Sequence, residues 1–417
     1  MKLALPKKWL IAGTVFAAVL GIACGSQVGS SALSSPLNVA DTSNFVADTG
    51  PGPSPIVEPD PLFRAELDDA RFDTRAWDTD FSRHTVAFAD IFSGGVGRDG
   101  IPPIDNPQFE SIEEAEAVMN DLEPVVTFKI NGEARAYPLA ILTWHEIIND
   151  VVGGEPVTIT FCPLCNSALT FKRTLEGRVF DFGVSGNLRN SDLIMWDRQT
   201  QTWWQQLTGE AIIGELAGHR LEFVPASIIS WADFKAANPD SLVLSRNTGF
   251  DRPYGSNPYS GYDRVDRPPF LFDGDLDERL LPKERVAAFE VGGVSAAFPF
   301  RRLEIERVVN YQVNGTDVVV LFKLGTVSAL DRALIIDSKD VGSTGVFEAH
   351  LDGRKLTFSL QDGEFVDDQT GSVWNILGEA VEGEMTGKSL TPIVHGNHFW
   401  FAWGAFNPET LIYKGVG

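Results

Sequence analysis

The stretch TFKINGEARAYPLAILTWHEIINDVVGGEPVTITFCPLCNSAL, at residues 127–169, has a diverged copy later in the same chain. Residues 288–330 read AFEVGGVSAAFPFRRLEIERVVNYQVNGTDVVVLFKLGTVSAL and align with it without gaps. The alignment continues beyond these segments and pairs Gly132 with Gly293, Pro138 with Pro299, Ser167 with Ser328, Trp204 with Trp374, and Trp231 with Trp400. Order and spacing that recur in this way indicate an internal duplication.

Each copy is expected to fold mostly as antiparallel sheet. Residues 125–130 and 133–137 flank Asn131-Gly132, a dipeptide typical of tight hairpins. A helix is expected at 139–152 and a buried strand at 157–161. Further strands are expected at 171–174, 179–184, 193–197, 210–215, 220–224 and 241–244, with a short helix at 231–237. The predicted fold class is therefore α+β, mostly antiparallel β, in two diverged tandem repeats of one α+β unit.

The chain is predicted to have five parts. They are a lipoprotein signal peptide at 1–23, a flexible tether at 24–60, a leading segment with repeat 1 at 61–245, a linker or loop at 246–285, and repeat 2 at 286–417. The tether is rich in Ser, Gly, Pro and Asp and lacks hydrophobic periodicity. The 246–285 segment is rich in Gly, Pro and Tyr and is expected to join the repeats or to cover a groove.

The N-terminus has the pattern of an export signal. Lys2, Lys7 and Lys8 precede an apolar run of about fifteen residues, which suits a signal peptide better than a membrane span. The run ends at Cys24, in a context that resembles a bacterial lipobox, although Gly21 stands where Leu is usual. We expect an exported lipoprotein, attached to the membrane through lipid on Cys24 and facing the periplasm or the outside. Ordinary secretion and a retained membrane anchor are the alternatives.

The composition limits the partners. Thirty-four Lys and Arg against 57 Asp and Glu give a net charge of −23. Such a surface repels phosphate, so nucleic acid is not expected as a partner. The chain has only three Cys, which excludes a disulfide-rich scaffold and a four-cysteine zinc site.

Cys162 and Cys165, in FCPLCN at the end of a predicted strand, are the main candidate site residues. Two thiolates at this spacing chelate a soft metal such as copper or zinc, given further ligands. They also suit a redox dithiol, in which one thiolate attacks a disulfide and the other resolves the mixed intermediate. The third reading is a structural disulfide.

His145 and His398 are the candidate further metal ligands. Neither has a histidine counterpart in the other copy, and a duplicated fold keeps scaffold residues twice but site residues once. The alternative for His145 is a buried, hydrogen-bonded side chain, because it shares a helical stripe with apolar residues. The alternative for His398 is an incidental place in a loop.

Two polar loops are candidate ligand contacts. The first lies near the cysteines, and the second combines Tyr with Gly and Pro. The residues concerned are Asn166, Asn187, Asp192, Tyr254, Tyr262 and Asp263. The alternative for the second loop is an interdomain segment that packs its own rings.

With these motifs in view, the chain resembles the DUF3179 family of bacterial and archaeal proteins of unknown function. The resemblance runs from about residue 75 to 415 and depends on motifs that include WHE at 144–146, FCPLCN at 161–166 and FWFAW at 399–403. It implies an exported or membrane-anchored protein and no particular activity.

The leading hypothesis is an extracytoplasmic lipoprotein whose Cys-x-x-Cys site binds copper or zinc or acts as a redox dithiol. The rival is a non-catalytic binding protein with a structural Cys162–Cys165 disulfide and an aromatic ligand groove between the repeats. The sequence names no substrate.

Overall fold

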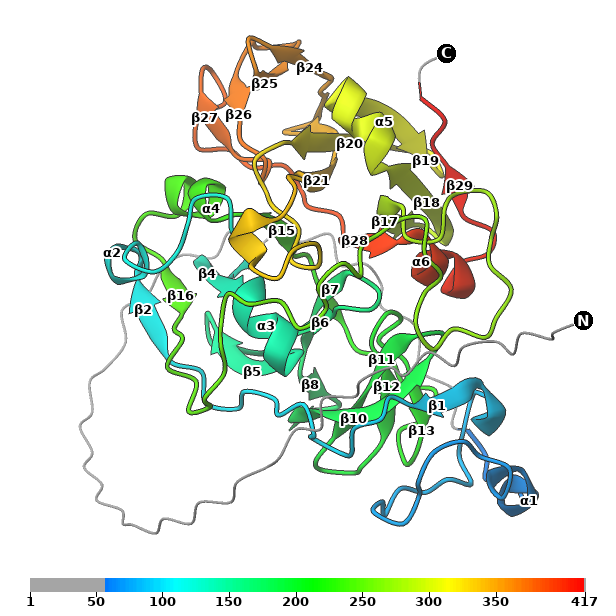
Figure 1. Cartoon of the computed structure of the whole chain (residues 1–417). Helices are drawn as coiled ribbons and strands as arrows, with labels where there is room; N and C mark the ends of the chain where they lie inside the picture. The colour runs from blue at the N-terminus through cyan, green and yellow to red at the C-terminus, as the bar shows by residue number, and fades with distance from the viewer. Residues whose placement is uncertain (1–56, 416–417) are drawn as a thin grey trace, which may run out of the picture. The chain divides into compact units, whose positions relative to one another are not determined.

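The computed structural model describes residues 57–415, all of which belong to one unit of the chain, Gly50–Gly417 (Figure 1). The predicted signal segment 1–23, the predicted lipid-attachment residue Cys24 and most of the predicted tether lie outside the described residues.

Short antiparallel strands dominate the described part of the chain, and the helices are few and short. The exceptions to antiparallel pairing between strands are β4 (Glu133–Pro138) with β16 (Leu242–Leu244), and β18 (Val294–Pro299) with β29 (Leu411–Ile412). The predicted α+β class with mostly antiparallel β is therefore confirmed.

The first half of the fold builds three sheets, with strand orders β14-β7-β6-β5, β1-β10-β11-β12-β13 and β15-β3-β4-β16-β2. Its elements besides β4 and β16 are β3 (Pro124–Ile130), α3 (Leu139–His145), β5 (Ile147–Val152), β6 (Glu155–Cys162), β7 (Ser167–Lys172), β8 (Thr174–Leu175), β9 (Arg178–Val179), β10 (Phe182–Arg189), β11 (Asp192–Asp197), β12 (Trp203–Gln205), β13 (Ala211–Ile213), β14 (Phe223–Val224), β15 (Ser227–Ser230) and α4 (Trp231–Ala237).

The second half builds the sheets β28-β17-β18-β29, β19-β20-β21 and β24-β25-β26-β27, and the two-stranded sheet β22-β23. Its elements besides β18 and β29 are β17 (Arg285–Val291), α5 (Phe300–Glu306), β19 (Val308–Val313), β20 (Thr316–Lys323), the 3-10 helix η2 (Ile335–Asp337), β21 (Ser343–Glu348), β22 (His350–Leu351), β23 (Arg354–Lys355), β24 (Phe358–Gln361), β25 (Glu364–Asp367), β26 (Val373–Trp374), β27 (Ala380–Glu382), β28 (His395–Phe399) and α6 (Trp400–Phe406).

A leading segment precedes both halves and packs on the first. Its elements are α1 (Phe63–Leu67), the 3-10 helix η1 (Phe88–Asp90), β1 (Ile91–Ser93), β2 (Phe109–Ser111) and α2 (Ile112–Ala115). Phe81 and Phe88 join a small hydrophobic cluster with Trp196 and Trp203. The segment 246–284 contains neither helix nor strand, in line with the predicted linker or loop.

The helix predicted at 139–152 is half as long as expected. It ends at His145, because Glu146 adopts a left-handed conformation with φ of 58°. Residues 147–152 form β5, which pairs antiparallel with β6. Ile147, Ile148 and the valines of this strand are β-branched and prefer a pleated surface, which explains the error.

The same hydrogen bonds occur in corresponding places of the two halves. Trp204 donates from Nε1 to Asp197 at 2.9 Å, and Trp374 donates from Nε1 to Asp367 at 3.0 Å. The Asn149 side chain donates from Nδ2 to the Phe182 carbonyl and accepts at Oδ1 from the Phe182 amide. Asn310 makes the same two hydrogen bonds with Phe358. Asn149, which is buried, thus joins β5 to the sheet of β10, and Asn310, which is exposed, joins β19 to the sheet of β24.

The strand register corrects one part of the alignment. Ser167 pairs with Cys162 where β6 meets β7, and Ser343 pairs with Lys323 where β20 meets β21. Ser343, and not Ser328, therefore stands at the position of Ser167. The gapless alignment fails here because a long connection, residues 324–342, replaces the short turn of the first half.

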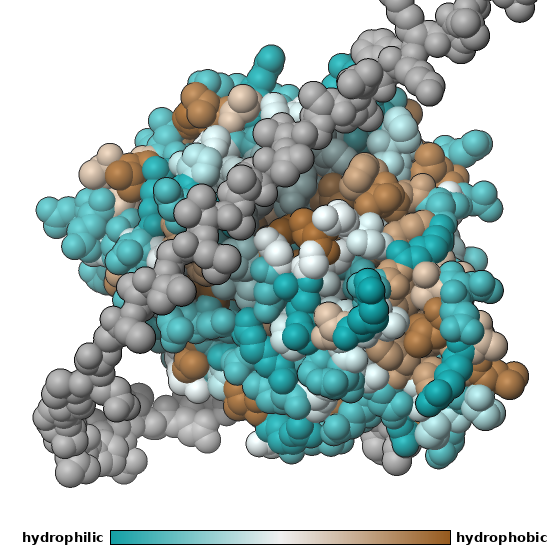
Figure 2. All heavy atoms as spheres, turned by 60° about the horizontal axis from the view of Figure 1, so that its bottom comes forward, coloured by the Kyte–Doolittle hydropathy of each residue, from teal (hydrophilic) through white to brown (hydrophobic). Residues whose placement is uncertain are grey.

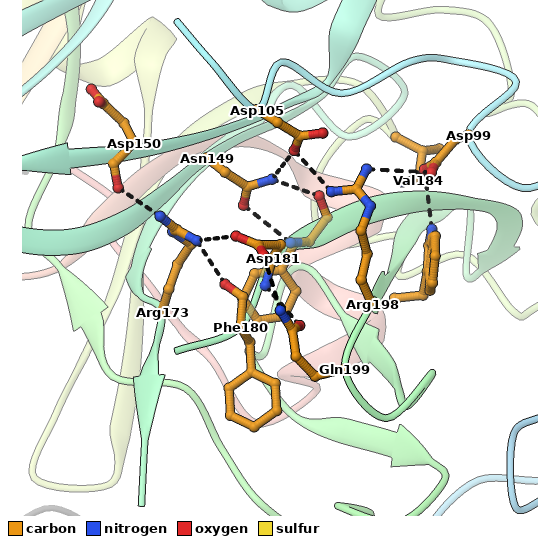
Figure 3. Close-up of polar contacts among 12 residues, drawn as sticks. Asp99, Asp105, Asn149, Asp150, Arg173, Phe180, Asp181, Val184, Arg198 and Gln199 are labelled. Carbon is orange, nitrogen blue, oxygen red and sulfur yellow. Dashed lines mark hydrogen bonds and ion pairs between the residues drawn. The ribbon is translucent and has the colours of Figure 1, made fainter. Parts of the chain in front are cut away.

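A polar network surrounds Asn149 on the first half (Figure 3). Asp105 accepts hydrogen bonds from Asn149 and from Arg198, both at 2.8 Å. Arg173 donates to Asp181, just before β10, and to the carbonyl of Asp150 in β5. These two bonds join β5 to the start of β10. The network satisfies groups that would be costly to bury unpaired, and we assign it to the scaffold.

No helix within residues 57–415 is both long and apolar enough to cross a membrane. On the face shown in Figure 2, hydrophobic residues are interspersed with hydrophilic ones.

Candidate functional site

The cysteines lie at the tip of a hairpin. β6 ends at Cys162, and β7 begins at Ser167, its partner across the hairpin. The turn between them is closed by a hydrogen bond from the Cys165 amide to the Cys162 carbonyl at 3.2 Å. Asn166 completes it with φ of 50°, a conformation that Asn tolerates. The Cys-x-x-Cys motif thus follows the end of a strand, as predicted, and the structure shows that this strand is the first of an antiparallel hairpin.

Strand β28 of the second half fixes this turn from the other side. The Phe399 amide donates to the Cys165 carbonyl at 2.8 Å, and the Asn166 side chain donates to the Asn397 carbonyl. The candidate site therefore lies where the two halves meet.

The two thiols meet a carboxylate. Cys162, Cys165 and Asp192 each place one ligand atom within 4.8 Å of the other two, and all three are at most 1% exposed. Both thiols are free in the structure and lie near the carbonyl of Ser191. The three side chains are arranged as a set that can hold a metal ion.

Hydrogen bonds to one oxygen of the Asp192 carboxylate hold the side chain in place, and the other oxygen is left to the two thiols. Oδ2 accepts from the Gln205 side chain at 2.7 Å and from the Leu207 amide at 2.9 Å. Oδ1 is buried and has no nitrogen or oxygen donor within residues 57–415, so the thiols of Cys162 and Cys165 are the donors beside this carboxylate. A buried acceptor left in this way costs free energy unless a proton or a cation fills the gap.

A second buried acid lies beside this set. The carboxylate of Glu146 accepts a hydrogen bond from the Tyr259 hydroxyl at 3.1 Å. Burial raises the pKa of Glu146 to about 7 and that of Asp192 to about 6. Burial also raises the pKa of both cysteine thiols, most strongly that of Cys165.

The acids have no cationic partner. Neither Glu146 nor Asp192 forms an ion pair with any Lys, Arg or His of the described part of the chain. Two buried carboxyls and two thiols thus share an environment that lacks positive charge. Such an environment favours the neutral forms or a bound cation.

His145 is not part of this set. Its Nδ1 bonds the Pro102 carbonyl at 2.7 Å, and its Nε2 bonds the Tyr254 hydroxyl at 2.6 Å. With both nitrogens occupied, the side chain matches the alternative of a buried, hydrogen-bonded histidine.

His398 likewise lies outside the group of residues whose ligand atoms meet at Cys162. It belongs to β28 and stacks on Trp403, with 5.2 Å between the ring centroids. Its burial lowers the pKa of His398 to about 3. His398 therefore lies in a strand, and not in the loop that was the alternative prediction for it.

The predicted ligand loops have separate fates. Asp192 joins the cysteines, and Tyr262 contributes a hydroxyl that accepts from the Phe270 amide at 3.3 Å. Asn187 is buried in β10, where its amide donates to the Ser185 hydroxyl. Asp263 pairs with Arg285 at 3.0 Å, so it is part of a buried ion pair.

Tyr254 has a further neighbour besides His145. It lines a pocket of about 340 Å³ with Glu123, Arg246 and Leu334, among others. The three tyrosines of the 246–285 segment all pack against the hydrophobic cluster that contains Cys162 and Cys165, and each makes its own polar contact. Tyr254 contacts His145 and Tyr259 contacts Glu146, whereas Tyr262 contacts the backbone of its own segment.

Sequence reasoning missed Glu146, Tyr259 and Gln205. Glu146 carried a usable signal, because Arg307 stands at its place in the second half and shares its left-handed conformation. The rule that selected the cysteines, that site residues occur once, selects Glu146 as well. Gln205 and Tyr259 carry no such signal, because only the folded chain brings them to the acids.

No curated protein and no solved structure matches this chain. One family does match, over residues 98–410, and its description is a protein of unknown function. Since the match covers most of the chain and includes both cysteines and Asp192, the chain belongs to the DUF3179 family.

Proposed function

We propose that Cys162, Cys165 and Asp192 bind one zinc ion. The observation that carries the proposal is the convergence of three buried ligand atoms within 4.8 Å of one another, among them Oδ1 of Asp192, which has no nitrogen or oxygen donor in the described part of the chain. Zinc takes thiolate and carboxylate ligands at about 2.0–2.3 Å, which requires only small movements of these side chains. Bound zinc would supply the positive charge that the buried acids lack.

The ligand types favour zinc over copper(I). A carboxylate is a hard ligand, whereas copper(I) selects thiolates and thioethers. Zinc accepts sulfur and oxygen together, and three protein ligands leave one position for water or another group. The carboxylate of Glu146 lies beside Cys162, and it is the protein group best suited to take this fourth position.

Burial argues against a redox dithiol that acts on other proteins. A thiol of that kind has to meet the substrate's disulfide, and its sulfur is usually partly exposed. Cys162 is 1% exposed and Cys165 is 0% exposed. The metal would instead hold the β6–β7 turn to the β10–β11 hairpin, in a site closed to large substrates.

The test is zinc content with a matched pair of variants. We expect wild-type chain, purified without a polyhistidine tag, to carry zinc that Cys162→Ser and Asp192→Asn each lose. Lys323→Ser is the control, because Lys323 stands at the position of Cys162 in the second half and is exposed. A zinc content in both site variants equal to that of Lys323→Ser would overturn the proposal, and so would a disulfide between Cys162 and Cys165 in the isolated protein.

We also propose that the chain is exported and carries lipid on Cys24. The basic start, the apolar run and the cysteine that ends it support this, and all lie outside the described residues. Labelled fatty acid should be incorporated into the wild-type chain and into Cys162→Ser, but not into Cys24→Ser. Equal labelling of all three would contradict a lipid on Cys24.

We further propose that the two halves of the chain arose by tandem duplication. It is supported by the matched hydrogen bonds of Trp204 and Trp374, and of Asn149 and Asn310. In this account the copies at 61–245 and 286–417 diverged, and the first alone carries the metal site.

A further inference from the structure

A second group of metal-ligating side chains lies in the leading segment, apart from the cysteines. Asp60, Glu66 and His84 each place a ligand atom within 4.8 Å of the other two. Asp60 precedes α1, Glu66 lies within it, and His84 lies in the loop before η1. We propose that these residues form a second zinc site, independent of the one at Cys162.

The hydrogen bonding of His84 prepares one nitrogen for a cation. Nδ1 lies 3.0 Å from the Val86 carbonyl, which can only accept, so Nδ1 carries the proton. In the neutral ring Nε2 is then an unprotonated acceptor. A histidine that donates from one nitrogen to a backbone carbonyl and offers the other to a metal is the usual arrangement at zinc sites.

The surroundings of Nε2 lack the donor that an acceptor needs. The atom is buried and makes no hydrogen bond with the described residues. It faces the Oδ2 atom of Asp60 at 3.4 Å, so a lone pair meets a carboxylate oxygen. A cation between these two atoms and Glu66 removes this repulsion and neutralises two carboxylates.

The ligand set indicates which cation fits. One imidazole with two carboxylates suits zinc, whereas calcium and magnesium prefer sites made of oxygen atoms alone. The exposure of Glu66 leaves room for water to complete the coordination.

Such an ion would fix the start of the folded chain. The His84 residue bridges Ile213 of β13, and the Thr85 amide donates to the Ile212 carbonyl at 2.9 Å. Asp60 is the last residue of the predicted tether, and Glu66 lies in α1, shortly after it. Zinc would thus join α1 to the edge of a sheet, at the point where the tether enters.

His219 provides a matched control. Its Nδ1 lies 2.9 Å from the Leu216 carbonyl, and its Nε2 faces the carboxylate of Glu176 at 3.3 Å. The geometry is that of His84 with one carboxylate instead of two. His219→Gln should therefore leave metal binding unchanged.

The experiment measures zinc per chain, and zinc affinity by competition with a chromogenic chelator, on the full chain without a polyhistidine tag. We expect two zinc ions in the wild type and in His219→Gln, and one in His84→Gln and in Glu66→Gln. Glu66 is exposed, so its variant keeps the fold even if His84→Gln does not. Zinc should also slow proteolysis near residues 60–70 in the wild type and not in Glu66→Gln.

The outcomes separate this proposal from that at the cysteines. In Cys162→Ser, one zinc ion should remain and should disappear on the further change Glu66→Gln. A single zinc ion that depends on Glu66 would support this site and contradict the cysteine site. Stoichiometry and affinity that are unchanged in both Glu66→Gln and His84→Gln would overturn it, and would mean that a proton on His84 Nε2 satisfies Asp60.

Discussion

The two halves of the fold present the same hairpin with different tips. In the first half, β6 and β7 are joined by the turn of residues 163–166, which carries Cys165 and follows Cys162. In the second half, Lys323 ends β20, is half exposed and pairs with Asp233. The scaffold that supports both tips is alike, so the chemistry resides in residues that the scaffold does not require.

The neighbouring hairpin shows the same contrast. β10 and β11 run Phe182–Arg189 and Asp192–Asp197, whereas β24 and β25 run only Phe358–Gln361 and Glu364–Asp367. The longer first hairpin, with a register shift between Val184 and Leu188, brings Asp192 to the cysteines. The greater length of this hairpin thus places the third side chain of the candidate site.

The largest effect is expected from the shared scaffold. Trp204 and Trp374 are both fully buried and both donate to an aspartate in the same half. Trp204→Ala and Trp374→Ala should each lower the free energy of unfolding by about 3–5 kcal/mol, through lost burial and the loss of one hydrogen bond to the aspartate. Denaturant unfolding measures both. Losses that differ by more than about 2 kcal/mol would show that the halves are not equivalent scaffolds.

The next effect should appear in the first half alone. Asp192→Asn keeps the size of the side chain and removes the charge. We expect its zinc affinity to fall by more than the roughly 10–100-fold loss that follows when a residue hydrogen-bonded to a metal ligand is replaced. Glu364→Gln, near the corresponding position of β25 and exposed, should leave zinc affinity unchanged. Competition with a chelator measures both variants, and an equal effect in the two would remove the contrast between the halves.

A pH-dependent difference is expected at β28. His398 of β28 and Ile229 of β15 occupy equivalent places in the two halves. His398 pairs with Val286, the second residue of β17, and Ile229 pairs with Val125, the second residue of β3. Burial lowers the pKa of His398 to about 3, against about 6.5 in an unfolded chain. The unfolded state therefore binds the proton first, and stability present above pH 6.5 is lost as the pH falls towards 3.

His398→Ile should remove this contribution. Between pH 6.5 and pH 4, the wild type should lose up to about 1.4 kcal/mol per pH unit more than the variant, measured by urea unfolding. Parallel curves for the two proteins would mean that His398 is not held neutral by burial.

The smallest effect concerns two turns. Asn131 donates to the Gly153 carbonyl at 3.0 Å, and Asn314 donates to the Gly292 carbonyl at 2.9 Å, so each half has one asparagine that links its two hairpin turns. Asn131→Gly and Asn314→Gly keep the positive φ and lose the bond. Each should cost about 1 kcal/mol in thermal or chemical unfolding. A cost confined to one half would show that the two turns contribute unequally.

Much of the fold could be predicted because it depends on local chemistry. Asn131-Gly132 specifies its hairpin, and α4 occupies the residues predicted for it. The helix at 139–152 was wrong because a single left-handed residue, Glu146, separates helix from strand. No pattern in one sequence distinguishes that conformation from a continued helix.

The candidate site could be predicted only in part. The cysteines were selected by their chemistry and by their single occurrence, and Asp192 was selected only as part of a polar loop expected near them. His145 and His398 were selected by the same rule, but contacts with Tyr254 and Trp403 account for their burial. Which unshared side chains face one another depends on hairpin length and register, and these are fixed by tertiary packing.

X-ray absorption at the zinc edge tests the central claim most directly, on the Glu66→Gln chain so that the proposed second site does not contribute. The account predicts zinc with two sulfur neighbours at about 2.3 Å and oxygen neighbours at about 2.0–2.2 Å. Both sulfur neighbours should disappear from any zinc that remains when Cys162 and Cys165 are replaced by Ser. Zinc surrounded by nitrogen and oxygen alone, or a chain that binds no zinc while both thiols are reduced, would contradict it.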